Sequence, residues 1–345
     1  MRILVVNAGS SSLKLALLGD DDEELWLREL EAPRARVADQ GVAAALDDLP
    51  AEPDAVGHRI VHGGERFREA VVIDSAVEGA LQELVALAPL HQPKSLAAVD
   101  AVTRAIPGVP AVACFDTAFH ATLPPEAATY ALPREWRTRP GFRRYGFHGL
   151  SHAYAARASG GARRVVTCHL GAGASLCAVL DGRSVDTTMG FTPLEGLVMA
   201  TRSGSVDPGL LLWLQRHEGV SADDMAQALE HESGLLGLAG TGDMRELLAR
   251  DDEDARLALG VYVHRVRAAV GAMAASLGGL DTLVFTGGVG ERSARVRELV
   301  CEGLEHLGVG SANSDVRVLV VRAREDLEIA RQVRELVGAQ GLESL

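Results

Sequence analysis

Charged side chains in this chain gather around glycine-containing segments, and their types suit work on anions. HRIVHGGERF places Arg59, His62 and Glu65 beside two glycines, and FDTAFH ends an apolar run with Asp116. Arginine presents a planar fork of N–H donors that matches a carboxylate or a phosphoryl group, and histidine exchanges protons near neutral pH. Taken singly, each has an ordinary structural alternative, as a hydrogen-bonded core histidine, a solvated arginine or a capping aspartate.

Three glycine-rich segments follow apolar runs: NAGSSS (7–12), HLGAGAS (169–175) and TGGVGE (286–291). Glycine lets backbone N–H groups approach an anion closely, and serine adds hydroxyl donors. None matches the G-x-x-x-x-G-K-[ST] phosphate loop, and GAGASL lacks the third glycine of the dinucleotide fingerprint. Each one alone favours a structural turn, whereas three in one chain favour a nucleotide-binding protein.

Composition narrows the setting. A formal net charge of −13 argues against nucleic acid or an anionic membrane as a partner. No window of about 18 uninterrupted apolar residues predicts a membrane span. No H-E-x-x-H or C-x-x-C spacing supports a zinc site. The four cysteines are scattered, so they are expected to be reduced, in a soluble cytoplasmic protein.

The elements that would position these residues alternate between strands and helices. Strands are predicted at 2–6, 13–18, near 58, before Asp116, on both sides of the 171–173 turn, at 282–286 and at 316–321. Helices are predicted at 41–49, 76–87, 325–337 and in an amphipathic segment after the 287–290 turn that runs to Leu307. The proline-rich stretch 124–140 is expected to connect two halves. The strand–turn–strand pattern of the opening recurs at 164–180, which indicates a mixed α/β chain of two related lobes.

Ten segments, in order along nearly the whole chain, resemble the signature motifs of the acetate kinase (acetokinase) family. They are NAGSSSLK, HRIVHGGE, PLH-x-P, FDTAFH, RRYGFHGLSH, HLGAGAS, TRSG-x-x-DPG, SGLLGL, DMR and FTGGVGE. The resemblance implies the fold shared by acetate and sugar kinases, actin and the heat-shock chaperone ATPase. That fold has two ribonuclease-H-like lobes, each a mixed sheet with flanking helices, around a nucleotide cleft. Residues 1–120 plus 327–345 would form the N-terminal lobe with a returning C-terminal helix, and 121–326 the second, nucleotide-binding lobe.

The resemblance also implies the chemistry: reversible, Mg²⁺-dependent transfer of the ATP γ-phosphoryl group to acetate, giving acetyl phosphate and ADP, in a homodimer. Mn²⁺ is an alternative metal. The residues that match the family's transfer machinery are Arg59, His91, Asp116, His148 and Arg202. The role of Asp116, as general base or in metal and phosphate orientation, stays open. Asn7 and Glu325 match the metal-associated positions, with Asp326 as a rival to Glu325.

Further matched positions concern ATP and the acyl group. Those matching ATP contacts are Lys14, His169, Leu170, Gly171, Ala172, Gly173, Asp243, Met244, Arg245, Gly287, Gly288, Val289, Gly290 and Glu291. Those matching the enclosure of the acetate methyl group are Val61, Leu90, Phe147 and Pro193, with Arg59 facing the carboxylate. A pocket of this kind separates acetate from propionate by only about 1–3 kcal/mol per methylene. A propionate- or butyrate-preferring kinase is therefore one alternative.

The chain departs from the family pattern at several positions. Ala172 stands where the family commonly has Asn, Ser205 where an acidic residue is usual, and GTGDMR is one residue short. The chain is also shorter than typical members, mostly between residues 19 and 57. These changes leave a second alternative, a non-catalytic actin-like nucleotide-binding protein.

Overall fold

The computed structural model describes residues 1–9, 12–31, 39–88, 92–311 and 314–341. It divides into two compact units: unit 1 comprises Met1–Ala121 and Arg324–Leu345, and unit 2 comprises Thr122–Ala323. Glu325, which the resemblance assigned to the end of the second lobe, belongs to unit 1.

Unit 1 contains a six-stranded mixed sheet in the order β3-β2-β1-β4-β6-β5. Its elements are β1 (Ile3–Ala8), β2 (Ser12–Leu18), β3 (Glu24–Glu31), α1 (Asp39–Leu46), β4 (Ala55–Ile60), β5 (Val71–Val72), α2 (Ser75–Glu83), α3 (Gln92–Ala105), β6 (Ala111–Phe115) and α14 (Glu325–Gln340), with 3-10 turns at Leu84–Leu87 and Ala118–Thr122. β1, β2 and β3 form an antiparallel meander, while β1, β4 and β6 are parallel.

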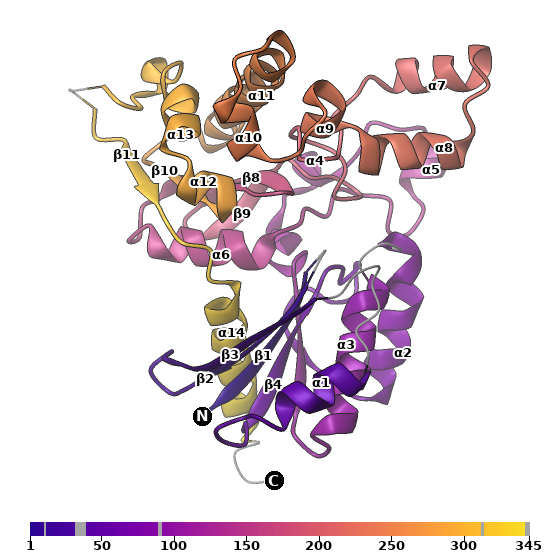
Figure 1. Cartoon of the computed structure of the whole chain (residues 1–345), viewed down its shortest axis with the longest axis vertical. Helices are drawn as coiled ribbons and strands as arrows, with labels where there is room; N and C mark the ends of the chain where they lie inside the picture. Colours follow the sequence, from indigo (N-terminus) through magenta and orange to yellow (C-terminus); the bar gives the residue numbers. More distant parts are fainter. Residues whose placement is uncertain (10–11, 32–38, 89–91, 312–313, 342–345) are drawn as a thin grey trace. The chain divides into compact units, whose positions relative to one another are not determined.

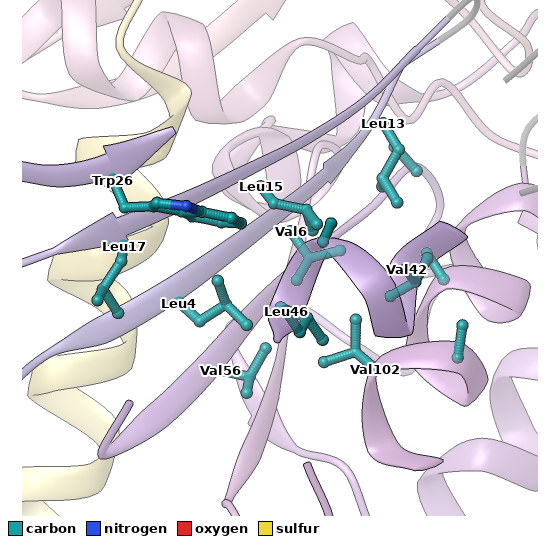
Figure 2. Close-up of a cluster of buried hydrophobic side chains, with 14 residues drawn as sticks. Leu4, Val6, Leu13, Leu15, Leu17, Trp26, Val42, Leu46, Val56 and Val102 are labelled. Carbon is teal, nitrogen blue, oxygen red and sulfur yellow. The ribbon is translucent and has the colours of Figure 1, made fainter. Parts of the chain in front are cut away.

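Helices cover both faces of this sheet (Figure 1). On one face, side chains from β1, β2 and β4 pack against α1 and α3; Leu4, Val6, Leu15, Val42 and Val102 are among them (Figure 2). On the other face, Gly57 of β4 lies against Ile329 and Val333 of α14. Because side chains alternate along a strand, Arg59 shares the α14 face with Gly57.

Unit 2 contains a five-stranded sheet in the order β11-β10-β7-β8-β9. Its strands are β7 (Arg164–Leu170), β8 (Ala174–Leu180), β9 (Arg183–Thr187), β10 (Thr282–Thr286) and β11 (Arg317–Val320). Its helices are α4 (Pro125–Ala128), α5 (Arg134–Arg137), α6 (Gly149–Ala158), α7 (Pro208–His217), α8 (Ala222–Gln227), α9 (Gly234–Ala239), α10 (Met244–Ala249), α11 (Glu253–Leu277), α12 (Gly287–Arg292) and α13 (Ala294–Cys301), with a π turn at Ala228–Glu232 and a 3-10 turn at Glu305–Leu307.

The two sheets repeat one plan. In each, an antiparallel three-stranded meander is followed by two strands that run parallel to its first strand, so β1, β4 and β6 correspond to β7, β10 and β11. Unit 1 adds the short strand β5, antiparallel to β6, at the edge of its sheet. The expectation of a mixed α/β chain with two duplicated lobes is confirmed.

Two local expectations are wrong. The glycine run at 287–290 was expected to be a turn, but Gly287–Arg292 is the helix α12, entered through Gly287 at φ +78°. The helix predicted to continue to Leu307 ends at Cys301, and Leu304 is buried beyond its end.

None of the helices in the described part of the chain is long and apolar enough to cross a membrane. The four cysteines are free thiols, and three of them, Cys114, Cys168 and Cys177, are buried.

Candidate functional site

A polar cluster lies at one edge of the unit 1 sheet. Asn7 lies near the carboxyl end of β1, Arg59 near that of β4, and Asp116 directly follows β6. Since β1, β4 and β6 are parallel, these ends meet at the same edge. α14 begins at Glu325 beside them, so four segments distant in the sequence bring their polar side chains together.

Arg59 is the centre of this cluster. Its Nη2 lies 2.6 Å from Asp116 Oδ2 and its Nε 3.2 Å from Oδ1, while Nη1 donates to Asn7 Oδ1 at 3.1 Å. Asn7 Nδ2 in turn donates to Glu325 Oε2 at 2.9 Å, and Arg59 Nε lies 3.8 Å from the same oxygen. The sequence left Glu325 and Asp326 as rivals; Glu325 bonds Asn7, whereas Asp326 pairs with Arg324.

Burial governs the electrostatics of this cluster. The Asp116 side chain is 1% exposed and that of Arg59 14%. Burial raises the pKa of the Asp116 carboxyl, the Arg59 guanidinium opposes that rise, and the nearby Glu325 adds to it. The arginine therefore compensates a carboxylate that the interior would otherwise disfavour.

The neighbouring His62 has a structural role. It is fully buried, its Nδ1 accepts from the Gly64 N–H at 2.9 Å, and Gln92 bonds both its backbone N–H and its carbonyl. Burial lowers the pKa of His62 to about 4, so it is neutral at pH 7. Lys14 lies opposite Asn7 in the β1–β2 ladder, half exposed, with its Nζ 4.0 Å from Glu29.

A second cluster lies in unit 2, around the 171–173 turn between β7 and β8. His148, which precedes α6, has φ +56° and ψ +24°, a left-handed backbone that a residue with a Cβ adopts only at a cost. Its ring stacks on that of His169 with centroids 4.4 Å apart. A Cβ on Gly173 would lie 3.2 Å from His148 Nε2 and 3.8 Å from Arg202 Nη1. Glycine at this position therefore lets two nitrogen donors come close to the backbone of the turn.

Arg202 is held in place by its own surroundings. Its Nη1 donates to the Pro193 carbonyl at 3.3 Å, and the Met199 N–H bonds the Arg202 carbonyl at 3.1 Å. Gly234, at φ +65°, approaches the Met199 and Arg202 backbones so closely that a Cβ would lie 2.2 Å from the Met199 oxygen. Burial lowers the pKa of the Arg202 guanidinium.

The glycine segment 286–291 of unit 2 lies against the 171–173 turn. A Cβ on Gly171 would lie 3.9 Å from the Gly288 nitrogen and 3.6 Å from His169 Nε2. Gly287 approaches the Leu170 backbone so closely that only glycine fits there. The Glu291 carboxylate accepts a hydrogen bond from the Gly287 N–H at 3.1 Å, so a side chain of α12 binds the first N–H of the same helix.

Other predicted residues lie elsewhere in the two units or outside the described part, except Pro193, whose carbonyl contacts Arg202 of the second cluster, and Phe147, which directly precedes His148. Asp243 caps α10 and pairs with Arg245, whose hydrogen bonds lower the pKa of Asp243 to about 2. Met244 is buried. Val61 belongs to unit 1, and Phe147 and Pro193 belong to unit 2. The remaining positions, Ser10, Ser11, Leu90 and His91, fall outside the described residues.

Sequence reasoning missed the supports of these side chains. Arg144 stands in the RRYGFHGLSH motif with no role assigned from the sequence. It donates to the carbonyls of Thr187, Thr188 and Met189 and pairs with Glu195 at 2.6 Å. Ser175 and His152 bond each other beneath His148. The four-residue spacing of His148 and His152 was the available signal, because it puts both on one helical face.

The candidate metal ligands in the unit 1 cluster are oxygen donors. Among the residues that the structure describes, no group of three His, Cys, Asp or Glu side chains could hold a metal ion. The unit 1 cluster offers the Asn7 amide oxygen and the Glu325 carboxylate. Such a sparse, all-oxygen set fits Mg²⁺, which keeps several waters and takes one or two carboxylates together with substrate phosphates.

Comparison with known proteins gives a consistent answer. The Acetokinase family model matches residues 32–331. An acetate kinase from Clavibacter sepedonicus is 45% identical over 392 aligned residues, covering 96% of this chain and 98% of that protein.

Two solved structures are equally similar in fold. The acetate kinase of Porphyromonas gingivalis has a TM-score of 0.88 at 36% identity, covering 97% of this chain and 99% of that one. A propionate kinase from Francisella tularensis subsp. tularensis has a TM-score of 0.88 at 35% identity, covering 96% and 98%. This chain is an enzyme of the acetokinase family.

Proposed function

We propose that this enzyme transfers the γ-phosphoryl group of ATP to acetate, reversibly and with Mg²⁺. Beyond family membership, one observation carries the proposal: His148 Nε2 and Arg202 Nη1 meet beside Gly173 in a glycine-rich turn. Two nitrogen donors next to an exposed backbone suit a phosphoryl group, whose charge spreads over three equatorial oxygens during transfer.

In the forward reaction a carboxylate oxygen of acetate attacks the γ-phosphorus, and the bond from that phosphorus to the bridging oxygen of ADP breaks. Acetate is ionised at neutral pH, so no base has to remove a proton from it. We therefore assign Asp116 a positioning role, since both its oxygens bind the Arg59 guanidinium and fix its plane. Arg59 would then bind the acetate carboxylate, while His148 and Arg202 stabilise the transferring group.

The metal would be held by Asn7 and Glu325 together with water and the ATP phosphates, where it neutralises phosphate charge. Asn7 Oδ1 now accepts from Arg59, and Glu325 Oε2 accepts from Asn7. These two residues therefore couple the metal position to the orientation of Arg59.

The remaining positions that match ATP contacts keep that assignment as part of the proposal. Gly171, Gly173 and Gly288 leave the backbone accessible where phosphates would lie. Gly287 is buried and its N–H binds Glu291, so it would act by turning the chain into α12. Lys14, half exposed on β2, would contact ATP through its ammonium group.

The direct test is trapping of acetyl phosphate as the hydroxamate with ATP, Mg²⁺ and acetate. Product that depends on Mg²⁺ and disappears in Arg202→Ala supports the proposal. Absence of product from folded protein that still binds ATP by calorimetry would instead favour a non-catalytic nucleotide-binding protein.

A propionate-preferring enzyme is the second candidate, because the propionate kinase structure is as similar in fold as the acetate kinase structure. Values of kcat/KM for acetate, propionate and butyrate decide between them. We expect acetate to be favoured over propionate by roughly 10- to 200-fold, the range for one methylene.

A further inference from the structure

A chain of hydrogen bonds runs from His148 into the interior of unit 2. His148 Nδ1 lies 2.9 Å from Ser175 Oγ, Ser175 Oγ lies 2.8 Å from His152 Nε2, and His152 Nδ1 lies 2.7 Å from Thr167 Oγ1. Ser175, His152 and Thr167 are fully buried. Such short contacts between buried polar groups are hydrogen bonds whose proton positions must be mutually consistent.

The far end of the chain sets the direction of donation. Thr167 Oγ1 donates to the Cys177 carbonyl at 3.5 Å, an acceptor that cannot donate back. A hydroxyl has one proton, so Thr167 accepts from His152 Nδ1–H. Full burial favours a neutral ring at His152, and a neutral ring protonated on Nδ1 has a bare Nε2, to which the Ser175 hydroxyl donates. Ser175 Oγ therefore accepts from His148 Nδ1–H.

The strand register makes this arrangement possible. Thr167 pairs with Cys177 and His169 with Ser175 across β7 and β8, so all four point to the face that α6 covers. His148 and His152, at the start of α6 and one turn further, lie above that face. The charged or titratable groups that lie close to His148 in unit 2 include His169, stacked on it, Arg202, near Gly173, and His152, linked to it through Ser175.

We propose that Ser175 and His152 are positioning residues that hold the proton of His148 on Nδ1 and leave Nε2 beside Gly173. A ring that donates from Nδ1 can donate from Nε2 only when both nitrogens are protonated. His148 therefore stabilises the transferring group as an imidazolium. This inference rests on the proposed function for its catalytic meaning, whereas the hydrogen-bond order itself is a property of the fold.

The first test is the pH dependence of kcat. In the wild type, kcat falls on the alkaline side as His148 loses its Nε2 proton. Ser175→Ala removes an acceptor that stabilises the imidazolium, so this alkaline limb moves about one pH unit lower. If Ser175 instead donated to His148, its removal would move the limb higher. An upward shift, or no shift, overturns the proposal.

A matched control is Ser159→Ala. Ser159 is equally buried, ends the same helix α6 and donates to the Ala156 carbonyl at 2.6 Å, outside the chain to His148. The alkaline limb of the kcat profile of Ser159→Ala is expected to coincide with that of the wild type.

The second test needs no activity and no variant of Ser175. NMR of the protein labelled with ¹⁵N-histidine reports which ring nitrogen carries the proton, with the His148 signals assigned by their loss in His148→Gln. We expect neutral His148 and His152 both protonated on Nδ1. A neutral His148 protonated on Nε2 overturns the proposal. If the protein makes no acetyl phosphate, the proposed function fails and these spectra still decide the hydrogen-bond order.

Discussion

At the level of single residues, the Arg59–Asp116 pair is a buried ion pair at the proposed acetate site, so one substitution should affect both stability and activity. Replacing Arg59 by alanine leaves the 1%-exposed Asp116 carboxylate uncompensated. Breaking a buried pair from one side costs about 3–5 kcal/mol, so Arg59→Ala should lower the free energy of unfolding by that amount and abolish acetyl phosphate formation. Urea unfolding and the hydroxamate assay measure the two effects.

A double variant separates these effects. Adding Asp116→Asn to Arg59→Ala removes the buried charge, so most of the stability should return while activity stays lost. As a control, Arg163→Ala breaks the exposed pair with Asp181 and should cost less than about 1 kcal/mol. Equal stability of Arg59→Ala and the wild type would contradict the argument.

His58 should make the stability of the protein pH-dependent. Its side chain is 1% exposed, and neither ring nitrogen has a hydrogen-bond partner in the part of the chain that the structure describes. Burial lowers its pKa to about 3. The unfolded chain takes up a proton at this residue near pH 6.5 and the folded chain only near pH 3, so stability falls as the pH falls through this interval, by about 1.4 kcal/mol per pH unit.

Between pH 6.5 and pH 5, the free energy of unfolding of His58→Leu should therefore fall by about 2 kcal/mol less than that of the wild type. Denaturant unfolding at each pH measures this difference. His264→Gln, at an exposed position of α11, serves as the control and should keep the wild-type slope. An unchanged acid slope in His58→Leu would show that His58 is protonated in the folded state.

Part of the polar cluster in unit 1 could be singled out from the sequence, whereas the residues that support His148 in unit 2 could not. Asn7, Arg59 and Asp116 could be singled out because polar residues at the ends of apolar strands are conspicuous in a sequence. Ser175 could not, because its partners depend on the β7–β8 register and on where α6 lies, and neither is set by local pattern. Pairing between distant segments is the information that a single sequence lacks.

At the level of elements, Gly57 fixes how closely α14 approaches β4. A Cβ there would lie 2.4 Å from Ile329 Cγ2 and 2.8 Å from Val333 Cγ2, and both side chains are fully buried. Gly57→Ala should therefore lower the free energy of unfolding by about 1–3 kcal/mol, because the added methyl group overpacks this contact. Because α14 begins at Glu325, the same change should displace the Glu325–Asn7 bond and lower kcat.

Thermal unfolding with the hydroxamate assay tests this packing. Gly79→Ala is the matched control: Gly79 lies in α2 with nothing within 4 Å of its Cβ position, so alanine should stabilise by about 0.5–1 kcal/mol. If Gly57→Ala were as stable and active as Gly79→Ala, tight helix–strand packing would not be what requires glycine at position 57.

The elements themselves were predicted where the pattern was strong and missed where glycine was ambiguous. Apolar runs in the sequence predicted β1, β6, β7 and β10, because buried strands consist largely of apolar residues. The 287–290 run predicts a turn because glycine disfavours helices. In α12 the left-handed Gly287 turns the chain and Glu291 accepts its N–H, so tertiary context overrides propensity.

At the level of the whole molecule, the duplication explains why the candidate residues fall into two groups. The turn after β1 corresponds to the turn after β7, and the glycines after β4 correspond to those after β10. Unit 1 carries Asn7, Arg59 and the Glu325 end of α14, while unit 2 carries His148 and Arg202. The recurrence of the opening strand–turn–strand pattern at 164–180 therefore correctly predicted the duplicated fold.

The homodimer expected from the family resemblance can be tested on α7. None of the residues of α7 is buried, and Leu210, Leu212 and Trp213 are each 48–49% exposed. Large apolar side chains grouped on one short helix are typical of a protein–protein interface. We therefore predict that the wild type has twice the 36.4 kDa chain mass in solution and that α7 lies in the interface.

Introducing charge at this helix should separate the subunits, because a desolvated carboxylate without a partner opposes association. Leu210→Glu combined with Trp213→Glu should elute with the mass of one chain in size-exclusion chromatography with light scattering. Leu27→Glu, at an equally exposed leucine on β3, should stay dimeric. A folded α7 variant that keeps the dimer mass would place the interface elsewhere on the surface, and a monomeric wild type would rule out the dimer itself.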